Sequence, residues 1–112
     1  MKILGIGNAI VDVLCKVSDD FLTKHSLTKS TMKLIDEVEF KKLISSIKIE
    51  ETVSGGSVAN SIVGLSQLGN EAAFLGKIND DNLGHKYESG LEKEGVKFLY
   101  NKKKKIFQLV LV

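Results

Sequence analysis

Two adjacent glycines, Gly55 and Gly56, lie directly before the apolar segment 58–68, and this arrangement most constrains the fold. Neighbouring glycines allow backbone dihedrals and close approaches that a side chain would forbid. Ser57 is a good N-cap residue, and Gly69 is a good residue to end the helix in a left-handed conformation. The sequence therefore predicts a strand, a tight turn and then a helix. That helix is apolar on most sides, so we expect it to be buried.

The start of this helix is expected to face a polar ligand. A helix N-terminus offers unpaired backbone N–H groups and the positive end of the helix dipole. Asn60 would lie in the first turn, where its amide can donate and accept hydrogen bonds. Asp12 is a second candidate, because it lies among apolar neighbours in the extended run 10–17 and burying an unpaired charge is costly. The alternation leaves two interpretations open: Asp12 faces water, or it accepts hydrogen bonds from ligand hydroxyls.

The rest of the chain alternates between strand-like and helix-like segments. Helices are expected after Ser18, after Asp36 in a capping box with Glu39, and after the turn 79–82, with the inner face of the last formed by Leu83, Tyr87 and Leu91. Strands are expected at 2–7, 10–17, 30–35, 47–53, 71–78, 96–100 and 106–112. This order predicts an α/β sandwich with a mainly parallel sheet. Asp12 and the turn 55–60 would then meet at the carboxyl edge of the sheet, in a pocket for a polyol or nucleoside.

We interpret residues 1–112 as an incomplete N-terminal portion of a single domain. The apolar strand 106–112 runs to the last residue. A parallel sheet needs both faces covered, and the chain has few helices with which to cover one.

Composition argues against several classes of function. A net charge of +2 is too small to indicate nucleic acid or an anionic membrane as a partner. No stretch approaches the roughly 20 apolar residues of a membrane helix, and no signal peptide is evident, so the predicted location is the cytoplasm. Cys15 is the only cysteine, and His25 and His85 lack ligand spacing, so no metal site is expected. The lysine run 102–105 is interpreted as a solvated turn or edge strand.

Three motifs in order resemble the N-terminal part of the PfkB (ribokinase-like) family of sugar and nucleoside kinases. They are Gly-Ile-Gly-Asn at 5–8 with Asp12, Gly-Gly-Ser-Val-Ala-Asn at 55–60, and Phe-Leu-Gly-Lys-Ile-Asn-Asp-Asp at 74–81 followed by Gly84. The opening segment looks most like adenosine-kinase-like members. Val58, Ile62 and Asn79 depart from the family pattern, whereas the positions that face the substrate match it.

The resemblance implies roles for five residues. Asp12 would hold substrate hydroxyls, Asn8 and Asn60 would hydrogen-bond the sugar or nucleoside, and Gly55 and Gly56 would let the backbone approach it. It also implies a ribokinase-like fold with a small β lid that closes over the substrate. The lid strands are expected within 11–17, 31–35, 48–53 and 97–112, and a homodimer could form through the lid in the full-length protein.

The implied reaction is transfer of the ATP γ-phosphate, with Mg²⁺, to a hydroxyl group of a sugar or nucleoside. The second family signature, a Gly-Ala-Gly-Asp turn that carries the catalytic aspartate, does not occur in the 112 residues. No catalytic residue is therefore assigned, and the chain is expected to be inactive alone. The alternative is a non-catalytic fragment that binds a sugar or nucleoside.

Overall fold

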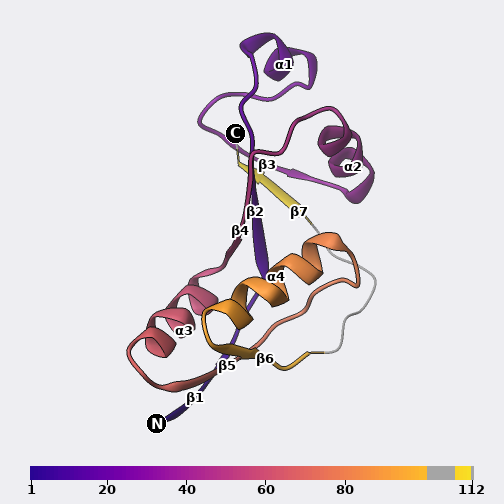
Figure 1. Ribbon diagram of the computed structural model, residues 1–112. Helices are drawn as coiled ribbons and strands as arrows, with labels where there is room; N and C mark the ends of the chain where they lie inside the picture. Colours follow the sequence, from indigo (N-terminus) through magenta and orange to yellow (C-terminus); the bar gives the residue numbers. More distant parts are fainter. Residues whose placement is uncertain (101–107, 112) are drawn as a thin grey trace. The chain divides into compact units, whose positions relative to one another are not determined.

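The structure is a computed structural model that describes residues 1–100 and 108–111 (Figure 1). The elements follow one another as β1 (Lys2–Ile6), β2 (Ile10–Leu14), α1 (Asp19–Lys24), β3 (Met32–Ile35), α2 (Glu37–Ser45), β4 (Glu51–Gly55), α3 (Ser57–Gln67), β5 (Glu71–Leu75), α4 (Asn82–Lys93), β6 (Val96–Phe98) and β7 (Gln108–Leu111). Each lies on a segment for which the sequence predicts the same kind of element.

The chain divides into two compact units, of which the first comprises Met1–Asp12 and Thr52–Lys105. Its sheet has the order β1-β5-β6, and both pairs of strands are parallel. Gly5 lies opposite Phe74, which lies opposite Phe98. The predicted α/β class with a parallel sheet is confirmed.

Helices α3 and α4 pack against this sheet (Figure 1). Phe74 and Tyr87 are fully buried, with ring centroids 6.1 Å apart, and Phe98 contacts both rings. The expectation that α3 is buried on most sides is wrong. Only Ala59 and Ile62 of this helix are buried, since one face lies on the sheet and the other meets solvent.

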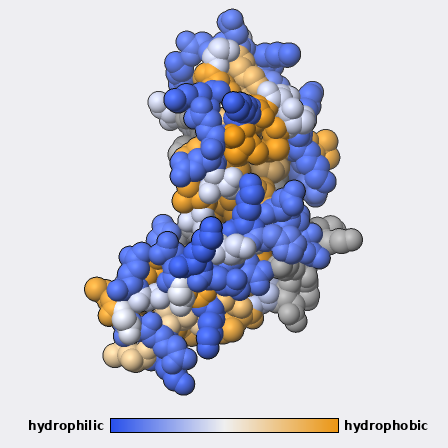
Figure 2. Space-filling view, viewed as in Figure 1, coloured by the Kyte–Doolittle hydropathy of each residue, from blue (hydrophilic) through white to orange (hydrophobic). Residues whose placement is uncertain are grey.

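Apolar residues are also exposed on β1, where Leu4 and Ile6 are 53% and 67% exposed. They alternate along the strand with Gly5, which is buried beneath α3. Figure 2 shows that the visible face of the molecule carries exposed hydrophobic residues beside hydrophilic ones.

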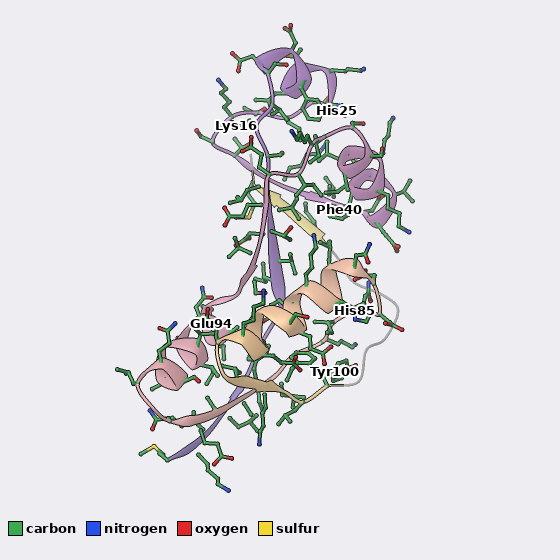
Figure 3. All side chains as sticks on the ribbon, viewed as in Figure 1. Lys16, His25, Phe40, His85, Glu94 and Tyr100 are labelled. Carbon is green, nitrogen blue, oxygen red and sulfur yellow. The ribbon has the colours of Figure 1, made fainter. Side chains whose placement is uncertain are left out.

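The ends of α3 and α4 are fixed by polar contacts. The Glu94 carboxylate accepts a hydrogen bond from Gln67 at 2.9 Å, and its backbone carbonyl accepts one from the Ser66 hydroxyl. Glu94 is labelled at the end of α4 in Figure 3. Gly69 has φ +88°, and its N–H donates to the Ser66 carbonyl, so the predicted end of α3 is confirmed.

The second unit comprises Val13–Glu51 and Ile106–Val112, and in it β3 pairs with β7 in antiparallel fashion. Ser18 and Asp36 cap α1 and α2 through their side chains, as predicted. The capping box is only half formed, however. The Glu39 carboxylate binds the Lys33 ammonium group at 3.2 Å and does not return to the backbone of Asp36.

Several strands are shorter than predicted because a strand ends where its partner ends. β5 stops at Leu75, whose carbonyl accepts the last hydrogen bond, from Gly7 just after β1. β2 ends at Leu14 and β4 begins at Glu51, and these two strands form their own two-stranded sheet. Residues 106, 107 and 112 and the lysine run 102–105 lie outside the described residues. The assignment of lid strands and of a dimer through them stays a prediction.

Within the described part of the chain, no helix is long and apolar enough to cross a membrane.

Replacing Gly64, within α3, or Gly69, just after its end, by alanine should change the stability in opposite directions. A Cβ at either Gly64 or Gly69 would meet no atom within 4 Å, so neither substitution causes a clash. Gly69→Ala forces a side chain into the left-handed region and should lower the free energy of unfolding by about 1 kcal/mol. Gly64→Ala improves helix propensity and should raise it by up to about 1 kcal/mol. Urea unfolding of both variants tests this, and changes of the same sign would contradict it.

Candidate functional site

The turn between β4 and α3 depends on glycine at position 56. Gly56 has φ +103°, and a Cβ there would lie 2.7 Å from the carbonyl oxygen of Asn8. Gly56 is also the N-cap, and no side chain caps the helix. The prediction that Ser57 is the N-cap is therefore wrong, because Ser57 is already the first helical residue. The first N–H groups of α3 consequently have no side-chain acceptor from a cap residue.

Asp12 lies beside this turn. Its Oδ2 would be 2.9 Å from a Cβ at Gly55, so the missing side chain of Gly55 leaves room for the carboxylate. Asp12 is exposed in β2, whereas Gly55 is buried at the end of β4. Among the described residues no hydrogen bond or ion pair engages the Asp12 carboxylate. Its oxygens thus remain open to donors from solvent or a ligand.

Asn8 and Asn60 flank the same turn. Asn8 connects β1 to β2, and its carbonyl lies against Gly56. The backbone N–H of Asn60 donates to the Gly56 carbonyl at 2.8 Å, which places Asn60 in the first turn of α3 as predicted. Both asparagines are exposed, and neither side-chain amide is engaged by the residues that the structure describes. Each amide can therefore both donate and accept hydrogen bonds.

Tyr87 is a part of this site that the sequence reasoning missed. Its hydroxyl donates to the Gly55 carbonyl at 3.3 Å, and the Ser54 hydroxyl approaches the Tyr87 carbonyl at 3.4 Å. The sequence places Tyr87 only on the inner face of a helix. The sequence does contain a signal for this role, because a tyrosine on a buried helix face usually requires a hydrogen-bond partner for its hydroxyl. Burial also raises the pKa of Tyr87 to about 12.

No metal cluster is found in the part of the chain that the structure describes: no group of three or more His, Cys, Asp or Glu side chains could hold an ion. His25 lies at the end of α1, and its ring is 4.3 Å from that of Phe21. His85 lies on α4, 3.0 Å from an Asp80 oxygen. Both histidines are labelled in Figure 3.

Sequence comparisons connect the chain to known kinases. The family model described as "pfkB family carbohydrate kinase" matches residues 26–107. Probable fructokinase-3 of Arabidopsis thaliana is 36% identical over 64 residues, which make up 53% of this chain and 19% of that protein. Adenosine kinase 2 of the same plant is 26% identical over 104 residues, or 88% of this chain and 30% of that protein. The chain thus spans less than a third of the length of these relatives.

Solved structures show the same fold. A probable sugar kinase from Rhizobium etli matches with a TM-score of 0.70 at 35% identity, over 89% of this chain and 30% of that one. Adenosine kinase from Sinorhizobium meliloti matches with a TM-score of 0.70 at 36% identity, over 89% of this chain and 31% of that one. Adenosine kinase from Anopheles gambiae, in complex with P1,P4-di(adenosine-5) tetraphosphate, matches with a TM-score of 0.68 at 27% identity. The match covers 89% of this chain and 31% of that one. The predicted ribokinase-like fold is confirmed.

The raised pKa of Tyr87 predicts a loss of stability at alkaline pH. The folded state holds the phenolic proton more tightly than the unfolded state, in which the pKa is close to 10. This contribution is complete below pH 10 and is lost as the pH rises to about 12. It amounts to at most about 2–3 kcal/mol. Unfolding measured against pH should show a steeper alkaline decline in the wild type than in Tyr87→Phe, while Tyr100→Phe should keep the decline. Equal slopes in all three proteins would contradict this.

Proposed function

This chain belongs to the pfkB family of carbohydrate kinases, and we propose that it supplies the acceptor-binding part of a kinase that transfers the γ-phosphate of ATP to a sugar or nucleoside hydroxyl. The observation that carries the proposal is the gathering of Asp12, Asn8 and Asn60 around the Gly55–Gly56 turn. These segments are distant in the sequence, and three of the five residues present polar side chains to solvent.

The chemistry of these groups suits a polyhydroxylated ligand. A carboxylate accepts hydrogen bonds at both oxygens, so Asp12 can bind two neighbouring hydroxyl groups at once. Hydrogen bonds to a charged acceptor are stronger than those between neutral groups. The two asparagine amides add donors and acceptors. The absence of a side chain at Gly55 and Gly56 leaves room for the Asp12 carboxylate and the Asn8 carbonyl beside the turn.

The acceptor class that we propose is a sugar or ribonucleoside. Relatives named as fructokinases and as adenosine kinases both match this chain, and the opening segment resembles the adenosine-kinase-like members. A nucleoside shares its ribose hydroxyls with the sugars, so one carboxylate beside a bare glycine turn suits both. The small-molecule acceptor is the partner that we propose.

The residues for phosphoryl transfer are not assigned within this chain. ATP is the proposed donor because the family is a kinase family, and one adenosine kinase relative contains a nucleotide analogue. The chain has no arginine, and its described residues contain no metal-ligand cluster. We assign none of these residues to ATP or Mg²⁺, and we derive no catalytic step from them. Binding without transfer is what we propose for these 112 residues alone.

The binding role predicts a specific loss in Asp12→Asn. The amide keeps the shape of the side chain but loses its charge and one acceptor. The affinity for adenosine or D-ribose should fall by about ten- to a hundredfold, since a hydrogen bond to a charged group contributes about 1.5–3 kcal/mol. Titration followed by NMR measures this directly. Asp20→Asn in α1 is the matched control, because it makes the same change at an exposed carboxylate in the second unit.

Two results would count against the proposal. One is an affinity that Asp12→Asn leaves unchanged while the wild type binds. The other is a wild-type chain that is folded by circular dichroism but binds neither adenosine, D-ribose nor D-fructose. Release of ADP by the chain with ATP and an acceptor would show instead that it contains groups for phosphoryl transfer, and would overturn the assignment of binding alone.

A further inference from the structure

We propose that Tyr87 is a positioning residue of the candidate site, whose hydroxyl fixes the orientation of the peptide group between Gly55 and Gly56. The inference rests on the proposed function, because it assigns to that peptide the backbone N–H offered to the acceptor. Tyr87 comes from α4, an element that contributes none of the five predicted site residues.

The geometry links α4 to the turn at two points. The fully buried Tyr87 hydroxyl donates to the Gly55 carbonyl, and the Ser54 hydroxyl approaches the Tyr87 carbonyl. At Gly90, one helical turn further along α4, a Cβ would lie 2.5 Å from the Ser54 oxygen. This spacing lets α4 lie directly against the end of β4. The Gly55 carbonyl therefore accepts its hydrogen bond from a fully buried side chain of a helix that lies against β4.

Peptide planarity carries this constraint to the next residue. The chain contains no cis peptide bond within its described part, and in a trans peptide the C=O and N–H groups point in opposite directions. When Tyr87 holds the Gly55 carbonyl toward α4, the Gly56 N–H must point away from α4. Gly56 is the N-cap of α3, so this N–H has no acceptor within the helix.

The constraint is needed because glycine restrains this peptide so little. Rotating a peptide plane changes ψ of the residue before it and φ of the residue after it. Glycine populates positive and negative φ about equally, so Gly55 and Gly56 tolerate either orientation of the plane. Side-chain sterics cannot select one orientation here, and a directional hydrogen bond can. A phenol packed between Phe74 and Phe98 is a rigid donor for this purpose.

The test compares two single-atom deletions in the full chain. Tyr87→Phe removes the hydroxyl and keeps the buried ring, while Tyr100→Phe removes the hydroxyl of the only other tyrosine. The backbone amide signals of Gly56 and Ser57 in NMR spectra report the peptide orientation without any ligand. We expect Tyr87→Phe to shift or broaden them and Tyr100→Phe to leave them unchanged. If the productive orientation falls to about a tenth of the population, the affinity for adenosine or D-ribose falls about tenfold.

A second variant separates positioning from general stability. Val96→Ala removes buried volume in β6 without touching the hydroxyl, and it should lower the unfolding midpoint while preserving the Gly56 signal and the affinity. Unchanged Gly56 and Ser57 amides in Tyr87→Phe, or equal affinity losses in Tyr87→Phe and Val96→Ala, would overturn the inference. If Tyr87→Phe does not fold, the wild type still decides the matter: a Tyr87 hydroxyl proton that exchanges rapidly with water would overturn the inference, and a slowly exchanging one supports it.

The two proposals fail in different ways. A wild-type chain that binds neither adenosine nor D-ribose would remove the proposed function. The amide signals of Gly56 would then still show whether Tyr87 orients the peptide.

Discussion

The close approach of α3 to β1 is the contact on which the first unit depends. A Cβ at Gly7 would lie 2.9 Å from the Cβ of Val58, and one at Gly5 would collide with Ile62. Val58 and Ile62 are two of the residues that we interpreted from the sequence as departures from the family pattern. Their bulk is accommodated because the facing strand residues have no side chains. A larger residue at Gly5 or Gly7 would push the helix off the sheet, and the glycine turn at its N-terminus would move with it.

This packing explains why residues distant in the sequence meet at one turn. Once α3 lies on β1, its N-cap Gly56 comes against the Asn8 carbonyl at the end of that strand. β4 leads into the same turn and brings Gly55 beside Asp12 of β2, and α4 closes the other side through Tyr87. Close approaches to the Gly55–Gly56 backbone by the Asn8 carbonyl, the Asp12 carboxylate and the Tyr87 hydroxyl thus define the candidate site. The polar side chains at its surface are attached to positions that the packing has already fixed.

Local signals in the sequence predicted the secondary-structure elements and two of the helix caps. Apolar periodicity predicted the kind of each element, and short-range side-chain chemistry predicted the caps at Ser18 and Asp36, since a cap needs only residues three apart. Features that depend on contacts between separate elements were missed. Glu39 prefers the Lys33 ammonium group to the backbone, and the Tyr87 hydroxyl finds a carbonyl 32 positions away. The grouping of Asp12 with the turn was predicted, but the reason given for it was wrong. Asp12 lies in β2, which pairs with β4 in a separate two-stranded sheet, so it reaches Gly55 across that pair and not as part of the parallel sheet.

Exposure to solvent limits the affinity with which this candidate site can bind a ligand. Asp12, Asn8 and Asn60 all face solvent, so every hydrogen bond to a ligand replaces one to water. Such an exchange contributes about 1 kcal/mol for a bond between neutral groups and about 1.5–3 kcal/mol for a bond to the Asp12 carboxylate. One bond to Asp12 and two to the asparagine amides correspond to a dissociation constant on the order of 1 mM, before the entropy of binding is counted. Tighter binding requires that water be excluded from the carboxylate, which strengthens each electrostatic contact. A lid over the acceptor would meet this requirement, and the same exclusion would protect a transferred phosphoryl group from water.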